Sequence, residues 1–300
     1  MPLSSDIIEW YKKTSYKLFS SWVEKYIPYF ESLKPDLKKA NIKISLREYL
    51  SLAFMTSILV FLLEFPFVFI ITLFVPGFSV LMGFVFSFSL SIVFSAGIFL
   101  FFYIYPSVTV NERKKNIDFT LPFATLYLAT ISGSNAPPKT IFKILSEFED
   151  YGEISKEAKE ISKNINLFGM NVTDALKKAA SKSPSEDFKE LLWGINTTIS
   201  SGGNLSSYLH EKASIFMQDY RRRMAEYSQR MSTMLEIYIT LIIVGSIFFI
   251  VMSSMISAFG IGQSFVELVI ISQFLVIFLG LPLISIGFII MLKKMSPLSK

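Results

Sequence analysis

The sequence predicts an all-α, polytopic membrane protein in which four transmembrane helices, arranged as two hairpins, flank a cytoplasmic six-helix bundle. Three observations support this fold class. Of the 300 residues, 52% are hydrophobic and only 18% are charged, which is more apolar than soluble domains are. Four stretches are long and apolar enough to cross a bilayer. The charged residues gather in the segments between and beyond these stretches.

Residue types that support common enzyme chemistry are scarce. The chain has no Cys, so disulfides, thiolate catalysis and Cys-ligated zinc are excluded, and His210 is its only histidine. The sequence also lacks a P-loop, an H-E-x-x-H motif and an EF-hand loop. We therefore expect no catalytic residue, no cofactor-binding residue, no metal ligand and no cofactor.

The N-terminal segment, residues 1–48, is predicted to be a cytoplasmic amphipathic helical segment. Its apolar residues recur at helical spacing up to about Pro28, and many are aromatic. Three surfaces could receive this helix: the membrane surface, the cytoplasmic bundle or a partner. No basic region leads into an apolar run at the N-terminus, so we expect no cleaved signal peptide. Ser45 and Glu48 form a capping-box pattern where the first span begins. The apolar residues at helical spacing are Ile7, Ile8, Tyr11, Leu18, Phe19, Trp22, Tyr26 and Phe30.

The first transmembrane hairpin is predicted over residues 49–105, as spans at about 49–75 and 78–105 separated by Pro76 and Gly77. The first span contains Glu64. Its 18 Leu, Ile, Phe and Val residues, at roughly 0.3–0.6 kcal/mol each, outweigh one central charge costing about 3 kcal/mol. Two interpretations of Glu64 remain: a protonated or hydrogen-bonded carboxyl that faces neighbouring helices beside a kink at Pro66, or a proton relay or oligomer contact.

Residues 106–236 are predicted to form the cytoplasmic helical domain. Gly, Pro and Asn punctuation divides it into six helices. Five of them are expected at about 117–131, from Pro137 onward, at 154–168, after Asn171, and after Ser183 as N-cap with Glu186 three residues on. The acidic residues of this segment are expected on solvated helix faces: Glu147, Glu149, Asp150, Glu153, Glu157 and Glu160.

The sixth helix is expected to run from the bundle into the third span. Residues 205–244 contain neither Gly nor Pro, so one helix about 60 Å long is possible. The alternative is two helices that meet with a bend near residues 228–233.

Basic residues cluster near the predicted membrane surface. Two interpretations remain open for them: contacts with anionic lipid, or a docking patch for an acidic cytoplasmic partner. The cluster comprises Arg113, Lys114, Lys115, Arg221, Arg222, Arg223 and Arg230.

The second transmembrane hairpin is predicted over residues 237–292, with spans at about 237–259 and 268–292 separated by residues 260–264. Glu267 lies near the outer edge and is expected to be interfacial. Residues 293–300 form a tail. Of the 29 Lys and Arg residues, nine lie in 1–48, 17 in 106–236 and three after 292, so the positive-inside rule places these segments in the cytoplasm. The protein is thus predicted to be a multi-pass protein of the cytoplasmic membrane with both termini in the cytoplasm.

A series of motifs in the cytoplasmic segment resembles a known family. The motifs are NERKKNIDFTLPFATLYLATISGSN at 111–135, YGEISKEA at 151–158, Phe168-Gly169 with Asp174-Ala-Leu176, SPS at 183–185 and SSGGNLSSYL at 200–209. Together they resemble the type II secretion F domain, in particular its archaeal version in the membrane platform proteins of the archaellum (the FlaJ or ArlJ type) and of type IV pili. The likeness covers about residues 110–260 closely and the preceding spans more loosely.

This resemblance implies a non-enzymatic platform around which a filament is assembled. The partners it implies are a hexameric secretion ATPase docked on the F domain, pilin- or archaellin-like subunits, membrane lipids and a second copy of the chain in a dimer; no nucleic acid is expected. Many archaeal platform proteins carry two F domains, whereas one is visible here. The chain is therefore expected to be either a short platform that works as an oligomer or the N-terminal part of a longer one.

A different class of function is left as the alternative. Four spans in two hairpins also suit a small transporter or channel that uses Glu64 as its coupling site. A third class, a membrane-bound enzyme, has no residues that the sequence nominates. The sequence does not distinguish an archaellum from a pilus or a pseudopilus.

Overall fold

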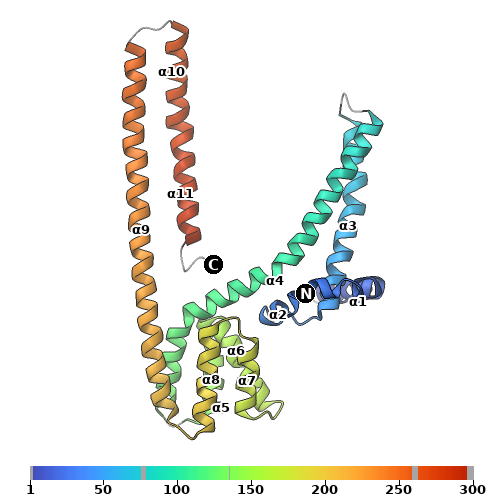
Figure 1. Ribbon diagram of the computed structural model, residues 1–300, viewed down its shortest axis with the longest axis vertical. Coiled ribbons are helices and arrows are strands. Elements are labelled where there is room, and N and C mark those ends of the chain that lie inside the picture. The colour runs from blue at the N-terminus through green and yellow to red at the C-terminus, as the bar shows by residue number, and fades with distance from the viewer. Residues whose placement is uncertain (1–2, 76–78, 135, 259–262, 296–300) are drawn as a thin grey trace. The chain divides into compact units, whose positions relative to one another are not determined.

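The protein is helical throughout the part of the chain described by a computed structural model, residues 3–75, 79–134, 136–258 and 263–295 (Figure 1). Four of its helices are long and apolar enough to cross a membrane, which confirms the prediction of an all-α protein with four candidate spans. The chain divides into two compact units, Met1–His210 and Glu211–Lys300, and each is described by itself. The candidate spans lie in Leu46–Leu73, Val80–Ser132, Leu205–Ile256 and Val269–Lys293.

The N-terminal segment folds into three short elements that pack against the first span. They are α1 (Leu3–Glu24), a 3₁₀ helix (Ile27–Phe30) and α2 (Leu33–Lys39). Val23 of α1 joins Leu33 and Leu37 of α2 and Leu46 and Leu50 of the first span in one buried apolar cluster. The amphipathic helix is therefore fastened to the protein itself, and it ends at Glu24, before the predicted end at Pro28.

Helices α3 (Leu46–Leu73) and α4 (Val80–Ser132) form the first hairpin. The predicted capping box is present: the Ser45 hydroxyl accepts from the Glu48 amide at 3.2 Å, and a Glu48 carboxylate oxygen accepts from the Ser45 amide at 2.8 Å. Side-chain hydroxyls tie the two helices together. Tyr49 donates to the Phe102 carbonyl at 2.7 Å, and Ser95 donates to the Ser57 carbonyl at 2.9 Å. In a bilayer such bonds satisfy polar groups that water cannot reach.

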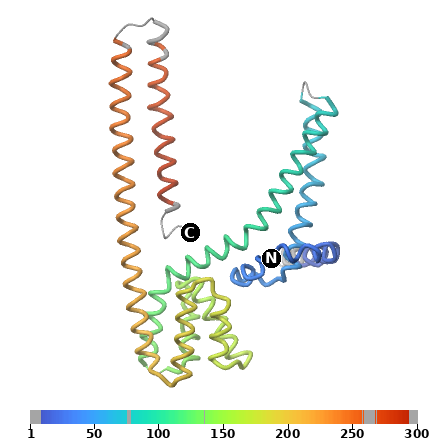
Figure 2. Tube along the Cα trace, viewed as in Figure 1, coloured from blue at the N-terminus to red at the C-terminus, as the bar shows by residue number. Residues whose placement is uncertain are grey.

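Helix α4 does not stop at the membrane edge. The sequence predicted a span that ends at residue 105 and a separate helix at 117–131, whereas one helix of 53 residues covers both. Pro106 and Pro122 lie inside it. Each proline removes one main-chain hydrogen bond and favours a change of direction without ending the helix. Figure 2 shows that α4 changes direction along its course as it leads from the hairpin to the bundle.

The bundle follows α4 along the chain. Ala175, Leu176 and Ala179 of α7 (Val172–Lys182) are all buried. The N-cap of α8 is Ser185 and not the predicted Ser183: the Ser185 hydroxyl accepts from the Phe188 amide at 3.1 Å, while the Ser183 hydroxyl accepts from the Ser185 amide. The elements are α5 (Pro138–Glu147), a 3₁₀ turn (Glu149–Tyr151), α6 (Glu153–Asn166), α7 (Val172–Lys182) and α8 (Glu186–Ser200).

Helix α9 (Leu205–Ala258) is one uninterrupted helix of 54 residues. This confirms the continuous helix predicted over 205–244 and extends it to Ala258. The alternative, two helices that meet near residues 228–233, is not observed. The division between the two units falls inside this helix, after His210.

The second unit contains the second hairpin, in which α9 is followed by α10 (Gln263–Leu275), a short π-helix (Val276–Gly280) and α11 (Leu281–Met295). Tyr238 of α9 stacks on Phe288 of α11 with ring centroids 4.2 Å apart, and its hydroxyl lies 2.8 Å from that of Ser285. The π-helix ends two residues before Pro282, which cannot donate a main-chain hydrogen bond, and the wider turn accommodates the lost bond.

Several predicted features lie outside the described residues. These are the loop at Pro76 and Gly77, Asn135 at the end of the first bundle helix, the loop residues from Gly260 to Gly262, and the tail beyond Met295.

Candidate functional site

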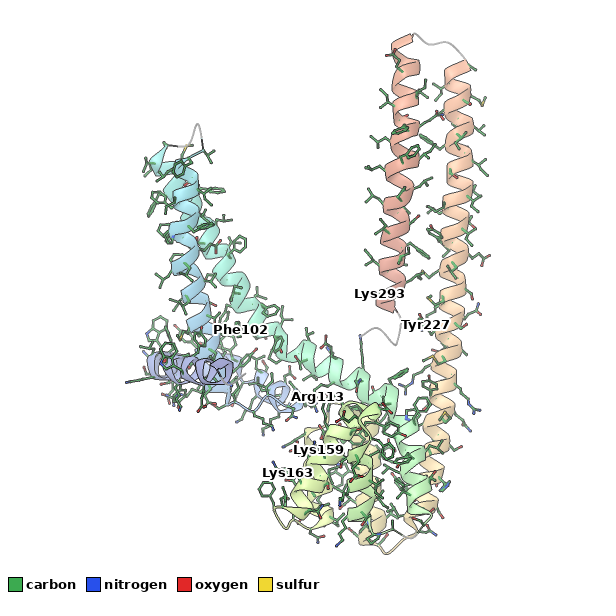
Figure 3. The ribbon with its side chains drawn as sticks, turned by 180° about the vertical axis from the view of Figure 1, so that it is seen from behind. Phe102, Arg113, Lys159, Lys163, Tyr227 and Lys293 are labelled. Carbon is green, nitrogen blue, oxygen red and sulfur yellow. The ribbon has the colours of Figure 1, made fainter. Side chains whose placement is uncertain are left out.

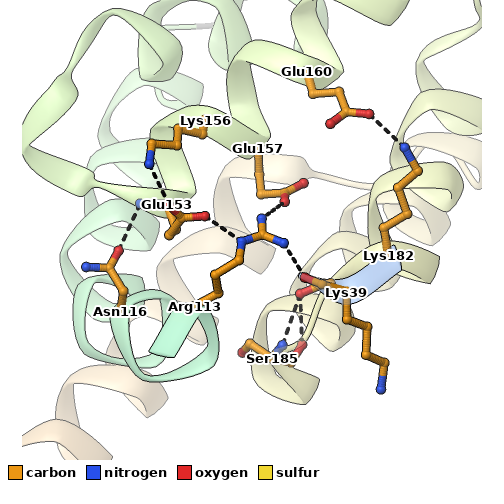
Figure 4. Close-up of polar contacts among 10 residues, drawn as sticks. Lys39, Arg113, Asn116, Glu153, Lys156, Glu157, Glu160, Lys182 and Ser185 are labelled. Carbon is orange, nitrogen blue, oxygen red and sulfur yellow. Dashed lines mark hydrogen bonds and ion pairs between the residues drawn. The ribbon is translucent and has the colours of Figure 1, made fainter. Parts of the chain in front are cut away.

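A buried ionic cluster joins α4, α6 and α2 where the first hairpin leads into the bundle. Arg113 of α4 lies at its centre (Figures 3 and 4). Its Nε donates to Glu153 Oε2 at 2.6 Å, its Nη2 donates to Glu157 Oε1 at 2.6 Å, and its Nη1 donates to the Lys39 carbonyl. Lys156 contacts the other oxygen of Glu153 at 2.7 Å. One guanidinium thus connects three helices that are distant in the sequence.

Burial makes the charges of this cluster depend on one another. The guanidinium of Arg113 is 9% exposed and the carboxylate of Glu157 is 5% exposed. Burial raises the pKa of Glu157, and the attraction of Arg113 only partly offsets that rise. For Glu153, burial also acts to raise the pKa, but hydrogen bonds from Lys156 and Arg113 outweigh it and hold the pKa below its usual value. Removing Arg113 would therefore leave two poorly hydrated carboxylates facing each other.

The expectation that the acidic residues lie on solvated faces is wrong for Glu157, which is 4% exposed. Glu153 is largely shielded as well, at 17% side-chain exposure. The spacing of apolar residues contained the missing signal. Glu157 lies three residues after Ile154 and four before Ile161, both fully buried, so it falls on the buried stripe of α6.

A glycine holds the neighbouring turn against α4. Gly152 has a φ of +56°, which L side chains rarely adopt, and a Cβ there would lie 2.6 Å from the Asn116 Oδ1 atom. That oxygen accepts from the Glu153 amide at 2.8 Å. The first turn of α6 is thereby held in the orientation that presents Glu153 to Arg113.

A second close contact fastens the start of α9 to α8. The ring of Tyr208 lies over Gly194, where an added Cβ would be 1.8 Å from the tyrosine hydroxyl and 2.3 Å from Cζ. Leu209, the next residue, is 1% exposed. The base of α9 is thus packed into the same unit as the bundle.

Replacing Gly194 by Ala should loosen this contact. Because the added methyl overlaps several ring atoms, Tyr208 must leave its site, and we expect a loss of about 1–3 kcal/mol in the local free energy of opening. Hydrogen exchange of the 205–210 amides in the full chain measures it. Gly245→Ala is the matched control, since no atom lies within 4 Å of its added Cβ. Equal protection in both variants would contradict the assignment.

The structure divides the predicted basic cluster into two kinds of residue. Arg113 is inside the protein and its guanidinium is engaged by the two carboxylates, so it does not offer the free charge that a lipid or partner contact requires. Lys114 and Lys115 are exposed. The residues of α9 are exposed too, with Arg222 at 3.1 Å from Asp219 and Arg230 at 3.9 Å from Glu226. The exposed residues of α9 in the predicted cluster are Arg221, Arg222, Arg223 and Arg230.

The two predicted intramembrane carboxyls differ in setting. Glu64 is partly buried in the first hairpin, and among the described residues its Oε2 atom has no hydrogen-bond partner. Phe61 and Phe65 flank it and both contact Phe88, so Glu64 lies level with the turn of α4 that carries Ser91. Glu267 is exposed, near the start of α10.

Metal-ligand chemistry is not apparent in the described residues. Within 3–75, 79–134, 136–258 and 263–295, no group of three or more His, Cys, Asp or Glu residues could hold a metal ion.

Comparison with known proteins finds similarity over the bundle and most of α9. The family model of the type II secretion system protein F matches residues 124–253, which begin inside α4 and end inside α9. No solved structure matches the chain.

Archaeal relatives match the same region. Flagella accessory protein J of Methanocaldococcus jannaschii is 28% identical over 135 residues, which are 45% of this chain and 23% of the relative. Flagella accessory protein J of Methanococcus voltae is 23% identical over 172 residues, 57% of this chain and 30% of the relative. An uncharacterized protein of M. jannaschii is 29% identical over 136 residues, 45% of this chain and 23% of that protein.

The matched segments thus span less than a third of the length of these relatives. The likeness nevertheless falls on the bundle and the helix that leads from it toward the third candidate span. Residues 124–253 of this chain match the type II secretion system protein F family, and the chain is similar in this region to the flagella accessory proteins J of archaea.

Proposed function

We propose that this protein is a non-enzymatic membrane platform for the assembly of an archaellum or a type IV pilus-like filament. In this role a cytoplasmic secretion ATPase docks on the protein F domain, and filament subunits are drawn from the bilayer beside the spans. The bundle and both termini face the cytoplasm. A second copy of the chain completes the platform as a dimer.

One observation carries this proposal. The family match extends along the chain from the bundle to the third candidate span. A single helix, α9, begins in the bundle and continues into that span. A helix of 54 residues is about 80 Å long. Such an element can carry a displacement of the bundle into the bilayer, because a continuous hydrogen-bonded helix bends gently but does not fold back on itself.

The polar part of α9 carries a run of basic residues. Arg221, Arg222 and Arg223 occupy three consecutive exposed positions of α9, between the bundle and the apolar part of the helix. An acidic surface on the ATPase would be attracted to them, and the attraction would weaken with added salt. We assign a docking contact to these three residues, and a separate one to Lys114 and Lys115 of the first unit.

Changing Arg221, Arg222 and Arg223 together to Glu tests the docking assignment. We expect the purified full chain to lose at least about tenfold in affinity for the ATPase, because three attractive charges become repulsive. Binding is measured in nanodiscs at two salt concentrations.

The matched control changes Lys143, Lys159 and Lys163 to Glu. These three residues are exposed on α5 and α6, and their replacement alters the net charge by the same amount. Normal binding by the arginine variant together with a loss in the lysine variant would move the docking surface to the bundle. Absence of binding by the unaltered chain would contradict the platform function itself.

A further inference from the structure

The amphipathic helix α1 carries an apolar stripe that the rest of the protein leaves uncovered. Trp10, Leu18 and Trp22 are 64%, 63% and 62% exposed, whereas Val23 of the same helix is buried. Removing such apolar side chains from water is favourable in proportion to the area that is covered. Three of them on one helix therefore represent a large surface that another apolar phase would cover.

Contacts with α3 fix how α1 is turned. Ser20 accepts through its carbonyl from Arg47 Nε at 3.2 Å, and Glu24 pairs with Arg47 at 2.8 Å, both at the first turn of the span. The hydroxyl of Tyr11, on a different side of α1, lies 3.0 Å from that of Thr56. Thr56 is nine residues, about 14 Å, farther along the span than Arg47. The Tyr11 side of α1 therefore faces the membrane interior.

The exposed stripe lies on that same side. Leu18 and Trp22 follow Tyr11 by seven and eleven residues, which places all three on one face of a helix. Trp10 lies about 100° around the helix from Tyr11, seven residues before Lys17. The charged positions Glu9, Lys13 and Lys17 are spaced four residues apart on another face, where Lys13 pairs with Glu9 at 3.2 Å. The helix thus presents apolar side chains toward the bilayer and charges away from it.

Contacts of the segment that follows α1 also place this part of the chain beside the predicted spans. Tyr26 packs on Phe54 with ring centroids 6.3 Å apart, and Phe30 packs on Phe99 at 5.8 Å. Phe54 and Phe99 both lie inside the predicted spans. The exposed apolar surface of α3 continues directly beyond Thr56, beginning at Ile58 and Leu59. The stripe is therefore continuous with the surface that lipid tails cover.

We propose that α1 is an interfacial anchor that lies in the plane of the membrane and binds an anionic lipid bilayer. Leu18 and Trp22 insert at the boundary between headgroups and acyl chains, where amphipathic indole rings are favoured. Lys13 and Lys17 remain among the headgroups and attract their negative charge. The anchor holds the cytoplasmic end of the first hairpin at a fixed depth.

The three tryptophans of the chain allow a direct test. One variant keeps only Trp22 (Trp10→Phe, Trp193→Phe) and the other keeps only Trp193 (Trp10→Phe, Trp22→Phe). Both full-length proteins are reconstituted in vesicles of phosphatidylcholine and phosphatidylglycerol whose acyl chains are brominated either near the headgroup or near the methyl end. Trp193 of α8 is the internal control, since it belongs to the bundle.

We expect bromine near the headgroup to reduce the fluorescence of Trp22 to about half, bromine near the methyl end to reduce it less, and neither to affect Trp193. Adding Leu18→Asp to the Trp22 variant should weaken the quenching, while circular dichroism shows that the helices persist. Quenching of Trp22 that is no stronger than that of Trp193 would overturn the proposal. So would a Trp22 that is shielded from aqueous acrylamide yet insensitive to bromine, because protein would then cover the stripe.

Discussion

Replacing Arg113 by Leu should be among the most destabilising single substitutions in the bundle. The change removes three hydrogen bonds and leaves Glu157, which is 5% exposed, beside Glu153 without a balancing charge. Breaking a buried ion pair from one side costs about 3–5 kcal/mol. Hydrogen exchange of the α6 amides, measured in the full chain in nanodiscs, reports the free energy of opening.

Two further variants separate the buried charge from a general loss of packing. Adding Glu157→Leu to Arg113→Leu should restore part of the lost protection, because no isolated carboxylate then remains at that position. Arg47→Leu is the matched control: Arg47 also pairs with a glutamate on another helix, but its pair with Glu24 is exposed, so a loss of at most about 1 kcal/mol is expected. Strictly additive losses in the double variant would contradict this account of the cluster.

Features that depend on neighbouring residues were predictable from the sequence. The capping box of Ser45 and Glu48 needs only a spacing of three residues, and the continuity of α9 follows from the absence of Gly and Pro over 205–244. The four spans follow from length and hydropathy alone. Each of these depends on a chain segment that can be judged without its surroundings.

The interactions of Arg113 were not predictable in the same way. Its acidic partners are 40 and 44 residues away, and its carbonyl partner is 74 residues away. A run of three basic residues beside a span indicates a lipid or partner contact, because nothing local identifies a buried partner. Because α6 packs against α4, Arg113 faces inward, whereas Lys114 and Lys115 are exposed. The spacing of apolar residues on α6 could have identified Glu157 as buried. It could not have identified Arg113 as the partner of Glu157.

The continuity of α4 was missed for a related reason. Pro106 follows a long apolar run, and proline near a membrane edge usually indicates a helix end. Residues 107–118 after it are nevertheless helical, and they carry Arg113 and Ile117 into the bundle core. Tertiary contacts made two turns later offset the single lost hydrogen bond. As a result, both the second and the third span are continuous with helices of the bundle, through α4 and α9.

A break in α9 should therefore abolish filament assembly without affecting the proposed binding of the ATPase. Ser232 is exposed, so Ser232→Pro changes little besides the backbone: it removes the hydrogen bond to the carbonyl four residues earlier and costs about 3 kcal/mol of helix stability. We expect this variant to insert in the membrane and bind the ATPase normally while filament assembly is abolished in cells that lack their own copy. Ser232→Ala, which keeps the helix, should assemble filaments at the normal level.

Spin labels at positions 225 and 239, on either side of the substitution, measure whether α9 stays continuous in the variant. In the unaltered protein their distance distribution should be narrow and centred at about 21 Å, as fourteen residues of α-helix require. In Ser232→Pro it should broaden. Filament assembly by a variant with a broadened distribution would show that force does not pass along α9.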